Sequence, residues 1–216
     1  MSDFLPEPHL LLLYCLSIVV LNLTPGPDMT FFLSRSIAAG KAAGMAAMLG
    51  ATTGILIHTL LVVFGLSALI AASPSLYNLL RIAGALYLLY LAWQSLSHGS
   101  AFKVRAGNQP RSRPLAVEWM QGIAINLLNP KIVVFFLTFL PQFVPAGDPH
   151  AGSRLLALGL LFSVIGVTTM TPVVLAASAF SNWMLQRPVV TRAMDWLFAG
   201  VLGAFAARLL LTARNA

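Results

Sequence analysis

Long runs of apolar residues alternate with short polar segments along the chain. Each of six runs is long enough for a membrane-spanning helix, which needs about 20 residues. The runs predict helices at about 9–36, 42–72, 77–97, 116–141, 153–182 and 190–212. The first, second and fifth runs exceed the minimum length, so tilted or kinked helices are expected there. The pattern therefore predicts an all-α polytopic membrane protein with six transmembrane helices.

Helix-breaking residues interrupt the first and fourth runs. The first contains LNLTPGPDMTFFL (21–33), and the fourth contains INLLNPKIVVFFL (125–137). A proline inside a helix removes a backbone donor and clashes with the preceding turn, and glycine permits backbone geometry that other residues cannot reach. Transmembrane helices 1 and 4 are therefore predicted to be broken. The residues at the two breaks are Pro25, Gly26, Pro27, Asp28, Asn129, Pro130 and Lys131.

The two interrupted segments also resemble each other. Asn22 aligns with Asn126 and the Phe-Phe-Leu at 31–33 aligns with 135–137, at an offset of 104 residues. Each half of the chain would hold three spans, so the second half would enter the membrane from the opposite side. Inverted repeats with helix breaks at corresponding positions indicate the binding site of a transporter.

Composition agrees with a membrane protein. Hydrophobic residues make up 58% of the 216 residues and charged residues only 9%, whereas soluble domains carry about 25% charged residues. Six spans leave no room for a sizeable soluble domain. A single transmembrane transporter domain is expected over 1–216, with repeat one at about 8–98, a loop at about 98–114 and repeat two at about 115–213.

The net charge of +7 is interpreted as a topology signal and not as a nucleic-acid surface, because the basic residues lie in short loops between apolar runs. Eight Lys and Arg residues fall on one predicted side of the membrane, against four on the other. The eight are Arg35, Lys41, Lys103, Arg105, Arg111, Arg113, Arg187 and Arg192. The positive-inside rule then places both termini in the periplasm.

Asp28 and Lys131 are the acid and the base that lie well inside predicted spans, whereas Glu118 and Asp195 lie near predicted span ends. An ionisable residue inside the membrane is by default a candidate functional residue. One interpretation is a structural ion pair that locks the two halves together. In the other, Asp28 meets a substrate ammonium or a coupling proton. Lys131 then meets a carboxylate or keeps Asp28 ionised.

Each break is expected to free backbone groups inside the membrane. The first frees carbonyls near Asn22, and it starts a half-helix whose N-terminus can receive a carboxylate. Asn22 and Asn126 are expected to donate or accept hydrogen bonds near the breaks.

His58 lies in the middle of the second run and keeps two interpretations. Its imidazole titrates near physiological pH, which suits a proton relay. A histidine in this position can equally be a hydrogen-bonding group between packed helices.

Two glycine pairs, Gly40/Gly44 and Gly50/Gly54, have the spacing that lets helices approach closely. They are expected to pack within the bundle or between subunits, so they permit a homodimer.

Motifs of other chemistries are missing from the sequence. No phosphate-binding GxxxxGK[ST], HExxH or EF-hand pattern occurs, and Cys15 is the only cysteine. The four histidines are scattered. No cofactor, resident metal or enzymatic activity is therefore expected.

The motifs TPGPDM (24–29) and NLLNPKIVVFFLTFLPQF (126–143), with RIAGALYLLYLAWQSL (81–96) between them, resemble the LysE/RhtB family of amino-acid exporters. The similarity covers about residues 8–212. It implies a six-span transporter of the bacterial inner membrane that expels amino acids or related small metabolites, driven by the proton motive force. It also implies that the GPD and NPK residues lie at the translocation centre.

Three functions are compatible with these features. The first is a secondary-active, proton-coupled exporter of amino acids. The second is a metal or inorganic-ion exporter of related architecture, which would need several converging carboxylates or histidines. The third is a membrane scaffold or enzyme subunit, which leaves the duplicated breaks unexplained.

Overall fold

The computed structural model describes residues 6–66, 74–98, 113–145 and 148–213. All regular elements within these ranges are helical, which confirms the predicted all-α fold. The α-helices are α1 (Pro8–Leu23), α2 (Pro27–Ala39), α3 (Lys41–Leu61), α5 (Pro74–His98), α6 (Leu115–Leu127), α7 (Pro130–Val134), α8 (Ala151–Leu175), α9 (Ala177–Gln186) and α10 (Pro188–Ala213). Shorter π or 3₁₀ segments are η1 (Val62–Leu66), η2 (Phe135–Phe139) and η3 (Leu140–Phe143).

Both predicted helix breaks are present. The axes of α1 and α2 differ by 52°, and the helix from Pro130 to Phe143 is bent by 54° from α6. Pro27 and Pro130 are the first residues of α2 and α7, the position where a missing N–H costs nothing. The breakers therefore end one helix and begin the next, as predicted.

Three described helical segments are long and apolar enough to cross a membrane, namely Lys41–Gly65, Ala151–Leu175 and Pro188–Ala207. The two bent pairs bring the number to five if each pair is one span. The predicted third span corresponds to α5, whose apolar stretch Ile82–Ser97 is shorter. The molecule is thus a multi-pass helical membrane protein, and six spans in two inverted repeats remain a prediction.

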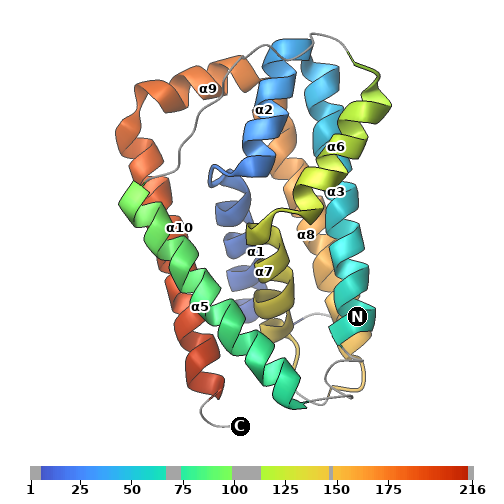
Figure 1. Cartoon of the computed structure of the whole chain (residues 1–216), viewed down its shortest axis with the longest axis vertical. Helices are drawn as coiled ribbons and strands as arrows, with labels where there is room; N and C mark the ends of the chain where they lie inside the picture. The colour runs from blue at the N-terminus through green and yellow to red at the C-terminus, as the bar shows by residue number, and fades with distance from the viewer. Residues whose placement is uncertain (1–5, 67–73, 99–112, 146–147, 214–216) are drawn as a thin grey trace.

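The predicted fifth run is longer than the helix that forms. α8 ends at Leu175, where Ala176 N donates to Pro172 O at 3.0 Å. The following α9 turns away and lies across one end of the bundle (Figure 1). The apolar segment 153–182 is therefore not one helix, because the chain bends four residues after Pro172.

Glycines allow α3 to lie against its neighbours α2, α6 and α8. A Cβ at Gly50 would collide with the backbone of Trp119, and one at Gly122 would collide with the carbonyl of Ala47. The Gly50/Gly54 pair thus packs within the chain and offers no surface to a second copy. Gly40 differs from the prediction, because it forms the turn between α2 and α3 with φ of +93°.

Replacing Gly122 by Ala is expected to destabilise the protein by at least about 1–3 kcal/mol, because the added methyl group must push two backbones apart. Gly200→Ala is the matched control, since a Cβ there meets nothing within 4 Å. Thermal unfolding of the purified variants in detergent measures both. Equal midpoints for the two variants would contradict the close α3–α6 contact.

Two buried apolar clusters lie on either side of the breaks. One is aromatic, joins α1 to η2, η3 and α8, and includes Tyr14, Phe135, Phe139 and Phe162. The other is rich in methionine, joins α2 to α3 and α8, and includes Met29, Phe32, Met48 and Met170. The polar residues of the breaks therefore lie between two apolar layers.

Candidate functional site

The first break is shaped by its local sequence. Thr24 Oγ1 donates to Val20 O at 2.6 Å, which closes the end of α1. Thr24 itself is extended, with φ of −72° and ψ of 122°, as expected for a residue that precedes proline. Gly26 is also extended, and α2 then begins at Pro27 with Asp28 in its first turn. An acid is favourable there because a helix N-terminus carries positive partial charge.

Asn129 forms the second break by capping α7. Its side-chain oxygen accepts a hydrogen bond from the backbone N of Lys131 at 3.1 Å, which satisfies one of the free donors of a helix start. Asn129 is buried, and its Nδ2 has no hydrogen-bond partner among the described residues. The Asn-Pro-Lys sequence thus restarts the helix and points the lysine toward the first break.

Lys131, in the second half of the chain, donates hydrogen bonds to backbone carbonyls that the first break leaves free. Its Nζ donates to Leu21 O at 3.0 Å and to Thr24 O at 3.2 Å. It also lies 5.4 Å from the ring centroid of Phe198, a cation–π distance. A Cβ at Gly26 would approach Nζ to 3.2 Å, so glycine leaves room for the ammonium group. The carbonyls freed by the break are therefore paired with a cation.

Asp28 is held by an asparagine of the second half. Asn126 Nδ2 donates to Asp28 Oδ2 at 2.8 Å. The side chain of Asn129 also interacts with this carboxylate, but the other oxygen, Oδ1, is buried and meets no donor with hydrogen-bond geometry in the described chain. Asp28 and Lys131, both within the described residues, do not form the ion pair that was one interpretation of the sequence. The acid and the base each hydrogen-bond to uncharged groups, and their opposite charges attract each other without direct contact.

A small cavity of about 40 Å³ lies between the two breaks, with room for about three water molecules. Its polar wall includes four of the predicted site residues, Asn22, Asp28, Asn126 and Lys131, together with Thr24 and Thr52. Its apolar wall is formed by Leu21, Met29, Phe32, Met48, Ala51, Ile55, Ile132, Gly166 and Met170. The remaining predicted residues at the breaks, Pro25, Gly26, Pro27, Asn129 and Pro130, shape the chain around this cavity without lining it.

Three polar atoms of the cavity residues are buried and lack a hydrogen-bond partner in the described part of the chain. They are Asn22 Nδ2, Asp28 Oδ1 and Asn126 Oδ1. Such groups are costly unless another molecule satisfies them. The residues of the polar wall therefore hold one donor and two acceptors that are unpaired in this conformation, and one of these acceptors, Asn126 Oδ1, lies against Gly54 of α3.

His58 lies outside this cavity. Its ring stacks on Phe136 at 5.7 Å between centroids, with 28° between the planes. Nε2 is buried and meets no hydrogen-bond partner in the described residues. His58 also interacts with Asp28 and with the backbone of Asn126, so helix packing and a proton relay both stay predictions for this residue.

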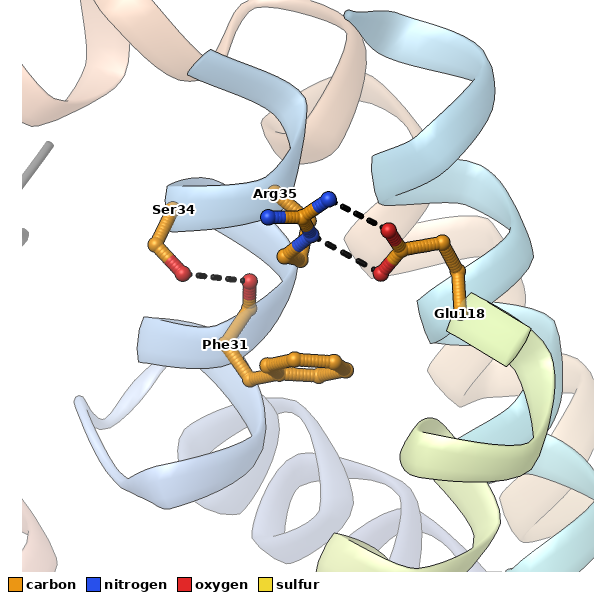
Figure 2. Close-up of polar contacts among 4 residues, drawn as sticks. All are labelled: Phe31, Ser34, Arg35 and Glu118. Atoms are coloured by element: carbon orange, nitrogen blue, oxygen red, sulfur yellow. Dashed lines mark hydrogen bonds and ion pairs between the residues drawn. The ribbon is translucent and has the colours of Figure 1, made fainter. Parts of the chain in front are cut away.

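An ion pair that the sequence pattern did not reveal joins α2 to α6. The guanidinium of Arg35 binds the carboxylate of Glu118 through two hydrogen bonds, one of them Nε to Oε2 at 2.8 Å (Figure 2). The side chains are only 1% and 0% exposed. Glu118 lies near a helix end, as predicted, whereas Arg35 was predicted to lie in the first loop and lies in the last turns of α2. Both residues are buried. In the sequence, an acid and a base that each lie about one turn from a helix end could have indicated this pair.

The described residues contain no group of three or more His, Cys, Asp or Glu side chains placed to hold a metal ion. The cavity itself contributes one carboxylate, that of Asp28. No feature of the described site therefore favours a metal or inorganic ion as its ligand.

Comparisons with known proteins agree on one family. The family model described as LysE type translocator matches residues 19–213. The leucine efflux protein of Klebsiella pneumoniae is 30% identical over 199 residues, covering 92% of this chain and 93% of the relative. The homoserine/homoserine lactone efflux protein of Salmonella typhimurium is 31% identical over 203 residues, covering 94% and 96%. No solved structure matches the chain.

Proposed function

The chain belongs to the LysE type translocator family, and we propose that it is a secondary-active exporter of amino acids or related small metabolites across the bacterial inner membrane. Relatives that match more than nine-tenths of the chain are named as efflux proteins for leucine and for homoserine. The family and its efflux relatives support a transporter and not an enzyme.

One observation carries the proposal: the unpaired polar atoms of the cavity complement an amino acid. An α-ammonium group offers three hydrogen-bond donors, and Asp28 Oδ1 is a buried acceptor that lacks a donor in the described chain. A carboxylate needs donors, and Asn22 Nδ2 and the Lys131 ammonium lie on the same polar wall. Binding a zwitterion would satisfy groups that are otherwise costly to bury.

The apolar wall of the cavity suits an aliphatic side chain. Met29, Met48 and Met170 supply flexible thioethers that adapt to different shapes. The cavity of about 40 Å³ has room for about three water molecules, so the proposal requires it to widen when an amino acid binds. Leucine, the substrate named for one group of relatives, fits this chemistry.

We further propose that protons drive export through the Asp28 carboxyl, which is the acid on the polar wall. The two halves of the chain would rock about the breaks as inverted repeats. α1 begins and α10 ends at the same end of the bundle (Figure 1), which supports an even number of spans. Arg35 is buried and paired, so seven basic residues instead of eight now favour periplasmic termini.

Counterflow in proteoliposomes tests this function. Vesicles loaded with unlabelled leucine are expected to accumulate labelled leucine from outside, and an imposed proton gradient should change the rate. A panel of labelled polar, charged and apolar amino acids at two pH values identifies the substrate class and the coupling together. If no member of the panel moves faster than in empty vesicles, the proposal is wrong.

A further inference from the structure

We propose that Arg35 and Glu118 form a gate that closes the cavity toward the end of the bundle where α2 ends and α6 begins. This inference rests on the proposed transport function, because a gate has a purpose only if the cavity must open. The pair does not line the cavity, and its partners are 83 residues apart in sequence.

The same two helices are joined at two levels. At the first level, Asn126 of α6 donates to Asp28 of α2. Arg35 follows Asp28 by seven residues and Glu118 precedes Asn126 by eight, so the ion pair lies about 10–12 Å along the helices from that hydrogen bond. Phe31 lies between the two levels and its ring projects on the side of Glu118 (Figure 2). A substrate that left the cavity between α2 and α6 would have to separate Arg35 from Glu118.

The physics of a buried ion pair suits a contact that opens. Removing two charges from water costs about as much as their attraction returns, so apolar residues of similar size often stabilise a protein at least as well. Separation of the pair in a water-filled opening returns the hydration of both charges. The closed and open states can therefore be close in free energy, whereas a purely apolar contact would favour the closed state.

The other end of the bundle has a corresponding contact of different chemistry. The offset of 104 residues that relates the two breaks also relates Glu118 to Tyr14 and Arg35 to Phe139. Tyr14 and Phe139 contact each other, with ring centroids 6.3 Å apart and planes at 17°. Corresponding positions of the two halves thus meet twice, as an ion pair at one end and as an aromatic pair at the other. Contacts between corresponding positions at both ends are expected when inverted repeats surround one central site.

The double variant R35M/E118L tests the gate, because it removes both charges and leaves no unpaired ion that would prevent folding. We expect a folded protein with an unfolding midpoint at least equal to that of the wild type, and export reduced at least tenfold. The matched control is D148L/R154M, which removes the Asp148–Arg154 ion pair that precedes and begins α8. Export by the control should stay near the wild-type rate.

A second readout needs no substrate. Cys15 is the only cysteine, so C15A/T52C places a single thiol on the cavity wall. A membrane-impermeant maleimide should label this thiol in vesicles that expose the gated end, and R35M/E118L should slow the labelling at least tenfold. Wild-type labelling in the double variant would overturn the gate, whatever happens to export. Loss of labelling without transport of any amino acid would instead keep the gate and refute the proposed function.

Discussion

Replacing Asp28 by Asn is expected to abolish export while leaving the protein folded in the membrane. The amide has the shape of the carboxylate and can still accept the hydrogen bond from Asn126 Nδ2. It loses the charge that we assign to the substrate ammonium and the site that we assign to the coupling proton. A hydrogen bond to a charged group contributes about 1.5–3 kcal/mol, so binding alone should weaken by roughly 10-fold to 150-fold.

Counterflow and proton-driven export by D28N measure the two roles of Asp28 together. Glu7→Gln is the matched control, because this carboxylate is 76% exposed at the start of α1 and should leave export unchanged. Size-exclusion profiles and membrane abundance of D28N should equal those of the wild type. Export by D28N at the wild-type rate would remove Asp28 from the mechanism.

Replacing Lys131 by Met is expected to damage both stability and export. The Leu21 and Thr24 carbonyls would lose their common donor in a buried position, and each buried unpaired group costs about 1–3 kcal/mol. Lys131→Gln separates the two effects, because its amide can donate to a carbonyl but carries no charge. We expect K131Q to recover much of the lost stability and none of the lost export.

Thermal unfolding and counterflow of K131M and K131Q, beside wild type, make this comparison. Lys41→Gln is the control for loss of a positive charge, since Lys41 is exposed at the start of α3. Transport by K131Q at the wild-type rate would show that Lys131 acts only as a hydrogen-bond donor to the carbonyls of the break, and that its charge has no role in transport.

The broken helices were predictable because their causes are local. Pro27 and Pro130 cannot continue a helix, and each begins a new one where the sequence suggested it. The partners of Asp28 and Lys131 were not predictable, because they depend on how two distant breaks meet. The ammonium group of Lys131 donates to the carbonyls of Leu21 and Thr24 and not to the carboxylate of Asp28. The reason is that the break leaves those carbonyls without helical donors.

Arg35 and Glu118 show where local patterns mislead. Each lies about one turn from a helix end, where charged residues normally meet water or lipid headgroups, and Arg35 was therefore counted as a topology signal. Their burial results from the approach of α2 and α6, which glycines at positions 50 and 122 permit by drawing α6 onto α3. The end of α8 could not be predicted either, because the apolar sequence continues through Ala176 into α9.

The central claim is that substrate binds in the cavity between the two helix breaks. An experimental structure with bound leucine tests it most directly. We predict ligand density between Asp28, Asn126 and Lys131, with the side chain toward Met29 and Met170. Density only elsewhere, for example in the 570 Å³ groove between α1 and α10 that is lined by Leu13 and Trp196, would contradict the claim.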